Sequence, residues 1–69
     1  MTTRNSILRR MSGADLQARM DAADLSIDRM AALAGVSARS LRRHIDYAAN
    51  PLPLRIHRMY DHVFGELPT

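Results

Sequence analysis

The stretch that decides the fold is IDRMAALAGVSARSLRRHID, residues 27–46. Its apolar residues recur at helical spacing on both sides of a glycine, which predicts one helix over 27–34 and a second from 38 to about 47. Gly35 is the residue expected where a helix ends in a left-handed turn, and Ser37 is a good N-cap for the helix that follows. Because only about three residues join the two helices, we expect them to cross steeply.

A close crossing of two helices makes specific demands on the residues at the corner. A small side chain is needed where the helices touch, a residue that tolerates positive φ in the turn, and an apolar side chain to fill the corner. The second helix must also turn apolar residues inward at a spacing of four. The residues that meet these demands are Ala31, Gly35, Val36, Leu41 and Ile45.

Apolar spacing predicts one more helix on each side of this unit. Residues 16–23 carry an inward stripe on a helix expected over about 13–23, with Ser12 as its cap. Residues 56–63 carry another on a helix that begins after Pro51 or Pro53 and ends at Gly65 and Pro68. Since no stretch alternates like a strand, we expect an all-α, compact domain of four or five helices.

Length and charge set the class of protein. Sixty-nine residues make one small domain at most, and cysteine is absent, so no disulfide framework is expected. The N-terminus lacks an apolar signal-peptide core and no apolar run approaches the length of a membrane span, so we expect neither. The net charge is +3, and its excess lies in residues 1–10 and 37–58. We therefore expect a flexible basic arm over 1–12, a domain over 13–69, and a polyanionic partner.

From residue 16 to about residue 63 the chain resembles the lambda-repressor/Cro-like (XRE-type) helix-turn-helix family. LQARMDAADLSIDRMAALAGVSARSLRRHI is similar to the first three helices of that family, and ANPLPLRIHRMYDHV is similar to its fourth. GVSARSLRRHI is also similar to one half of an AraC-type double helix-turn-helix, although this chain is too short for two. His44 departs from the pattern, because the family usually has an apolar or Trp side chain there, and Asp24 stands where Gly is common.

The resemblance implies a sequence-specific double-stranded DNA-binding transcriptional regulator, a repressor or Cro-like switch of phage, plasmid or mobile-element type, located in the cytoplasm and on the bacterial nucleoid. Its recognition helix, residues 38–46, would enter the major groove. The residues expected to contact bases are Ala38, Arg39, Arg42 and Arg43. Those expected to contact phosphates are Ser26, Ser37, Ser40, Arg55, Arg58, Arg4, Arg9 and Arg10. A homodimer on DNA would form through Tyr60, Phe64 and Leu67.

Other functions stay open at this point. The same helices could form a protein-interaction module, an antiactivator or antirepressor that uses the four Asp of residues 15–28 and the apolar C-terminal edge without touching DNA. A nonspecific architectural DNA binder would normally carry more charge. The three His do not share a helix face and no Cys accompanies them, so we expect no metal. No hydroxyl has a plausible base at a telling spacing, and paired carboxylates and a glycine-rich phosphate loop are lacking, so we expect no catalysis, cofactor or small-molecule substrate. His44 should be half-buried and hydrogen-bonded, and His57 and Asp61 should form a surface pair.

Overall fold

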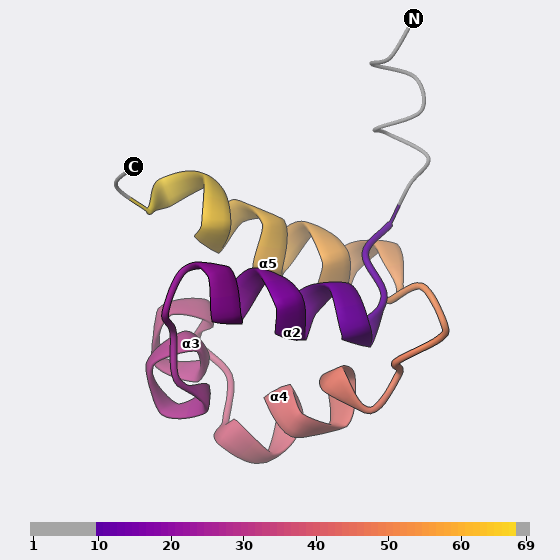
Figure 1. Ribbon diagram of the computed structural model, residues 1–69, viewed down its shortest axis with the longest axis horizontal. Coiled ribbons are helices and arrows are strands. Elements are labelled where there is room, and N and C mark those ends of the chain that lie inside the picture. The colour runs from indigo at the N-terminus through magenta and orange to yellow at the C-terminus, as the bar shows by residue number, and fades with distance from the viewer. Residues whose placement is uncertain (1–9, 68–69) are drawn as a thin grey trace, which may run out of the picture.

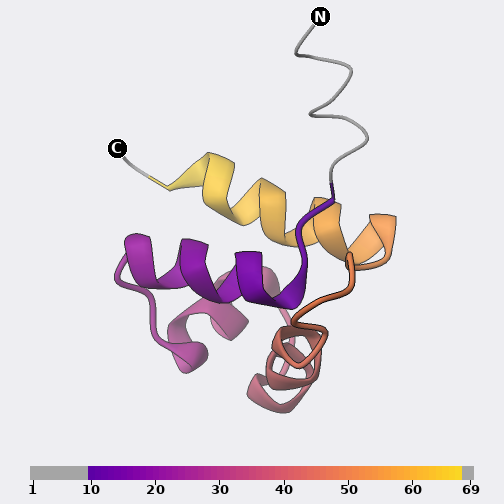
Figure 2. The same cartoon turned by 45° about the vertical axis from the view of Figure 1, so that its right-hand side comes forward.

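The computed structural model describes residues 10–67, which form four α-helices and no strand. The helices are α2 (Gly13–Ala22), α3 (Ile27–Ala34), α4 (Ala38–Ile45) and α5 (Leu54–Glu66). Figures 1 and 2 show α2 and α5 side by side and running in the same direction, with α3 and α4 on the other side of α2. α4 packs against α2 and α3, and α5 packs against α3. The prediction of a compact all-helical domain is confirmed.

Serine caps begin the first three of these helices. The hydroxyls of Ser12, Ser26 and Ser37 each accept a hydrogen bond from the backbone N–H three residues on, at 3.0–3.1 Å. Each such cap stabilises its helix by about 1 kcal/mol. Gly35 ends α3 at φ 75° and ψ 29°, the left-handed conformation that the sequence predicted. The corner between α3 and α4 is therefore fixed by local sequence.

One apolar core joins all four helices. Its buried side chains are Met11, Leu16, Met20, Met30, Ala31, Leu41, Leu52, Tyr60 and Val63. Val36 and Ile45 are half-buried and pack against this core. Of the other residues named for the corner, Leu41 is fully buried and Ala31 is buried, and Gly35 has the left-handed conformation.

The start of the domain differs from the prediction. Met11 was expected in the arm, but its side chain is buried in the core. Its N–H donates to Nδ1 of His57 at 3.1 Å, and its carbonyl accepts from the N–H of Leu52 at 2.8 Å. Ser12 forms a backbone bridge with Pro51. The packed domain therefore includes Met11, and residues 1–9 of the predicted arm lie outside the described residues.

Backbone contacts fix the end of α4. It stops at Ile45, two residues earlier than predicted, because the carbonyls of Tyr47 and Ala48 accept hydrogen bonds from the N–H groups of Gly13 and Ala14 at 2.8 and 3.3 Å. The N-terminus of α2 thus docks on the C-terminal end of α4. Gly65, expected to end α5, lies inside it. None of the helices within residues 10–67 has the length and apolar character needed to cross a membrane.

Candidate nucleic-acid interface

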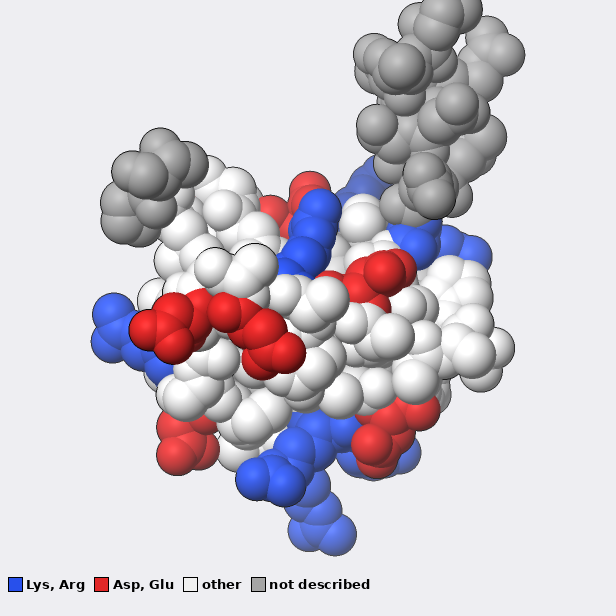
Figure 3. Space-filling view, in the orientation of Figure 1, with Lys and Arg blue, Asp and Glu red and all other residues white. Residues whose placement is uncertain are grey.

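α4 presents three arginines on a single short helix. Arg39, Arg42 and Arg43 are all exposed, whereas Leu41 between them is fully buried. At about 100° of rotation per residue, Arg39 and Arg43 lie on the side of α4 opposite Leu41, and Arg42 lies to one flank. Figure 3 shows blue atoms gathered at the lower edge of the molecule, where α4 lies in Figure 1. The helix therefore carries a basic ridge, defined here as Arg39, Arg42 and Arg43.

None of the arginines of the basic ridge forms an ion pair with a described acid, although the exposed Asp46 lies at the C-terminal end of the same helix. Within residues 10–67 the one ion pair joins Arg19 to Asp61, at 3.1 Å. Arg39 and Arg43 are four residues apart on the same helix, and like charges at that spacing destabilise a helix by about 0.2–0.5 kcal/mol. A helix that carries unpaired like charges at a small cost to its own stability is suited to a polyanion.

The N-terminus of α4 adds to this positive potential. The first turns of α2 and α3 contain Asp15 and Asp28, which offset the positive end of the helix dipole, but the first turn of α4 contains no acid. Ser37 caps α4, and its hydroxyl also lies 3.1 Å from that of Ser40. Ala38, the first residue of α4, is half-buried.

A hydrogen bond to α5 holds the back of α4. Nδ1 of His44 lies 2.6 Å from the hydroxyl of Tyr60, and the two rings meet edge to face with centroids 5.5 Å apart. Burial, and to a smaller extent the charge of Arg43, lowers the pKa of His44. Burial raises the pKa of Tyr60 to about 12. The phenol therefore stays protonated at neutral pH and can donate to the neutral imidazole. A polar pair fills the position where the resembled family usually has an apolar side chain.

The other residues predicted to contact DNA lie on different elements. Ser26 caps α3, where its hydroxyl accepts the N–H of Arg29. Arg55 and Arg58 are exposed on α5, and Arg10 is exposed at the first described position. Arg4 and Arg9 lie outside the described residues. The structure thus brings together the basic ridge with Ser37 and Ser40, and leaves the remaining basic residues on separate parts of the chain.

The three residues predicted as a dimer contact do not form one surface. Tyr60 is fully buried in the core, so that part of the prediction is wrong. Phe64 is half-buried, and the guanidinium of Arg19 lies 5.3 Å from the centroid of its ring. Leu67 lies elsewhere, at the edge of a groove that the sequence did not predict. Tyr60 packs inward and is therefore not available for a dimer contact, and the guanidinium of Arg19 covers the ring of Phe64.

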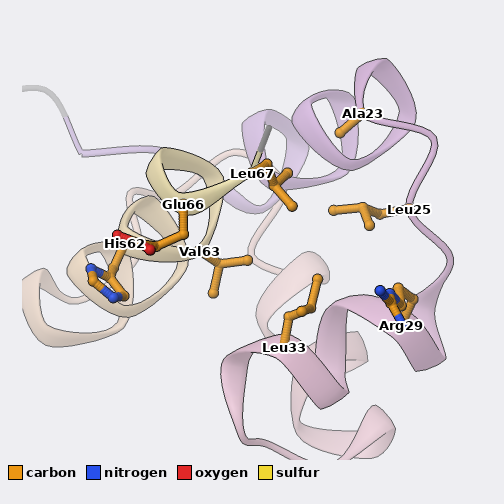
Figure 4. Close-up of a pocket in the computed structure, with 8 residues that line it drawn as sticks. All are labelled: Ala23, Leu25, Arg29, Leu33, His62, Val63, Glu66 and Leu67. Carbon is orange, nitrogen blue, oxygen red and sulfur yellow. The ribbon is translucent and has the colours of Figure 1, made fainter. Parts of the chain in front are cut away.

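This groove opens between α3, α5 and the connection that leads into α3 (Figure 4). We call it the α3–α5 groove; its volume is about 550 Å³, and its lining consists of Ala23, Leu25, Arg29, Leu33, His62, Val63, Glu66 and Leu67. Leu33 is 42% exposed in this groove, and no other large apolar side chain of α3 is exposed to this extent. The sequence held one signal for it, since Leu33 lies off the inward stripe formed by the other apolar residues of α3.

The histidines are dispersed over the domain. His44 bonds to Tyr60, His57 accepts the N–H of Met11, and His62 lines the α3–α5 groove. The predicted surface pair of His57 with Asp61 is not formed, because Asp61 pairs with Arg19 instead. Within the described part of the chain, no group of three or more His, Cys, Asp or Glu is placed to hold a metal ion.

No protein-family model matches this chain, and neither a curated protein nor a solved structure is significantly similar to it. The arguments for its function therefore come from the geometry and charge of α4 and from the residues that hold α4 in place.

Proposed function

We propose that this protein is a sequence-specific double-stranded DNA-binding transcriptional regulator of the helix-turn-helix type, and that α4 enters the major groove. The observation that carries the proposal is the basic ridge: three exposed arginines without an ion-pair partner on one helix of the described domain. An α-helix fits the major groove, and an arginine bonded to N7 and O6 of guanine is the most common specific contact there. The net charge of +3 is modest, so the support comes from where the charge is concentrated.

The geometry suggests different roles for the ridge residues. Arg39 and Arg43 point away from the core and would face base edges, with Ala38 beside them at the start of α4. Arg42 lies on the flank, where it could reach either a base or a phosphate. Ser37 and the first-turn N–H groups of α4 suit phosphate oxygens, because the positive end of the helix dipole is not offset by an acid there.

More distant basic residues would add contacts to the DNA backbone. Arg55 and Arg58 are exposed on α5, and Arg10 is exposed at the first described position. Arginines of this kind bind phosphates without regard to sequence, and each contributes to the salt dependence of binding. Ser26 and Ser40 could add neutral contacts to phosphates.

A second candidate function is favoured by the acidic residues near the connection between α2 and α3. Asp21, Asp24 and Asp28 are exposed, and within residues 10–67 none of them forms an ion pair. A surface of this charge would suit a basic protein partner, as in an antiactivator or antirepressor that does not bind DNA. The two functions differ in what a duplex DNA selection recovers.

Selection from a library of random duplexes, followed by gel shifts of the recovered sequences at low and high salt, tests the first function. We expect recovery of a preferred sequence and weaker binding at high salt. Arg43→Ala should relax preference at one base position and cost about 1–3 kcal/mol. Arg55→Ala is the matched control: it removes the same charge but should weaken all sequences equally and lower the salt slope by about one unit.

Two results would contradict the proposed DNA contact. One is the recovery of no preferred duplex and no salt-sensitive shift. The other is a preferred duplex that binds Arg39→Ala and Arg43→Ala with unchanged selectivity. A specific complex with a second, different protein in the absence of any DNA shift would support the antiactivator or antirepressor function instead.

A further inference from the structure

We infer that the α3–α5 groove binds a short amphipathic helix of a second, different protein, with apolar side chains on one face and basic side chains beside them. The groove shares no residue with the basic ridge, so the inference goes beyond the proposed DNA contact and holds whether or not α4 binds DNA. It also gives the acidic residues near the connection between α2 and α3 a defined site and a partner of defined chemistry.

The floor of the groove is apolar and open to solvent. Figure 4 shows Leu25, Leu33, Val63 and Leu67 around a common space. Leu33 is 42% exposed, and Leu25 and Leu67 are half-buried, so apolar surface on both sides of the groove remains in contact with water. Apolar side chains that converge on an open groove are typical of a surface that another molecule covers.

Acidic residues dominate the rim of the groove. The two segments that supply most of its lining, residues 21–29 and 62–67, carry four acids and one arginine, a net charge of −3. The acids are Asp21, Asp24, Asp28 and Glu66, all of them exposed, and within residues 10–67 none forms an ion pair. Glu66 lines the α5 wall, and Asp24 lies between two lining residues, Ala23 and Leu25. A partner with basic side chains beside its apolar ones would be complementary to this rim.

The same charge argues against two other occupants. DNA is a polyanion, so its backbone would be repelled by the acidic rim. Two copies of this chain that met groove to groove would place two surfaces of charge −3 against each other, and like charges across an interface disfavour the complex. The charge of the rim therefore favours a basic segment of another protein.

The walls of the groove suit a helix. α3 supplies Arg29 and Leu33, which are four residues apart and therefore share one face of that helix. α5 supplies His62 and Glu66 at the same spacing. A partner helix can pack between two such walls when its apolar side chains recur at helical spacing. α3 has eight residues and is about 12 Å long, which matches about two turns of a partner helix.

Selection from a displayed library of random peptides against the full chain tests the chemistry of the occupant. We expect the recovered peptides to carry apolar residues at positions i, i+4 and i+7 and a net positive charge. A labelled peptide of about 14 residues, with Leu at this spacing and Arg beside the Leu stripe, is the probe for fluorescence anisotropy. Replacing its Arg with Glu should weaken binding at least about tenfold at low salt.

Variants at two equally exposed leucines locate the binding site. Leu33→Gln should weaken binding of the labelled peptide at least about tenfold, because it removes an apolar contact at the centre of the groove. Leu54→Gln is the matched control: Leu54 is 43% exposed, but it lies at the start of α5, outside the groove, and should leave the affinity unchanged. Circular dichroism melts establish that both variants fold.

Variants at the acids test the charge of the rim. Asp24→Asn and Glu66→Gln should each weaken binding about threefold at low salt and less at high salt, because exposed charges are screened. Asn tolerates the φ of 57° at position 24, so this change leaves the backbone unstrained. Asp46→Asn is the matched control, since it removes an exposed acid at the end of α4 and should have a smaller effect.

Four results would overturn the inference. They are recovery of no peptide or of acidic peptides, equal effects of the Leu33 and Leu54 variants, equal effects of the rim acids and Asp46, and self-association of the full chain that Leu33→Gln abolishes. The last result would assign the groove to a second copy. The Arg39→Ala/Arg43→Ala variant should bind the labelled peptide as the unmodified protein does, so loss of DNA binding with intact peptide binding would refute only the proposed function.

Discussion

Replacing Gly13 with alanine tests how α2 supports α4. Gly13 begins α2, and its N–H donates to the carbonyl of Tyr47 at 2.8 Å. A Cβ at this position would lie 2.3 Å from the carbonyl oxygen of Ile45 and 2.6 Å from that of His44. Both atoms belong to the backbone at the end of α4, so no side-chain rotation can relieve the contact. The two helices must separate for the methyl group to fit.

The size of the effect follows from these distances. Real Cβ atoms essentially never come closer than 3.0 Å to such neighbours. The contact between the added Cβ and the carbonyl oxygen of Ile45 would be 0.7 Å shorter than this limit. Overpacking that moves backbone costs about 1–3 kcal/mol or more. A domain of 69 residues has a total stability of about 3–10 kcal/mol. We therefore expect Gly13→Ala to remove at least about 2 kcal/mol, which is a large part of the stability of the domain.

The other two described glycines provide matched controls in urea denaturation followed by circular dichroism. Gly65 lies inside α5 with open space around its Cβ position, so Gly65→Ala should raise stability by up to about 1 kcal/mol. Gly35 also has open space, but its φ of 75° should make Gly35→Ala cost about 1–2 kcal/mol through backbone strain alone. If Gly13→Ala is as stable as the unmodified protein, or costs less than Gly35→Ala, the backbone docking of α2 on α4 is wrong.

Four further substitutions or conditions test other parts of the structure. Asp24→Gly should raise the free energy of unfolding by up to about 1 kcal/mol, seen as a higher urea midpoint, because Asp24 has a φ of 57° that glycine adopts without strain. Tyr60→Phe should lower the melting temperature through loss of about 1 kcal/mol, since it removes the hydrogen bond to His44. Burial lowers the pKa of His44 from 6.5, so between about pH 6.5 and the lower pKa of the folded state the unfolded chain binds more protons than the folded one. Thermal melts should therefore show stability falling as the pH drops through this range. Arg19→Ala should cost about 1 kcal/mol or less in urea titrations, because its ion pair with Asp61 is exposed to solvent.

Local signals in the sequence were sufficient for the helices and for the corner between α3 and α4. Serine caps, apolar spacing and a left-handed glycine act within a few residues, and each therefore leaves a pattern that can be recognised without the fold. The burial of Met11 left no such pattern, because it depends on Leu52 and His57, which are more than forty residues away. The role of Gly13 was missed for the same reason, although one hint was present: Ser12 and Asp15 already suffice to start α2, so a glycine between them has another purpose.

The candidate site was predictable in part. Helical spacing alone places Arg39 and Arg43 opposite Leu41, and the structure has them there. Spacing could not predict that Tyr60 is buried, because α5 also carries Phe64 and other apolar residues, and only packing against α4 and α3 determines which of them turn inward. It could not reveal the α3–α5 groove either, since that groove exists only where the end of α5 meets α3.

The basic ridge is held on its inner side by interactions that do not involve the ridge residues. Leu41 anchors the middle of α4 in the core, the N-terminus of α2 docks on its end, and His44 bonds to Tyr60 of α5. A helix fixed in this way presents its outer side chains at a defined angle, and base recognition depends on such an angle because bidentate bonds tolerate little error. Under the proposed function, changes at the back of α4 should therefore weaken the binding of all DNA sequences together, whereas changes in the basic ridge should alter which sequence is preferred. The two effects separate the role of the scaffold from that of the contact surface.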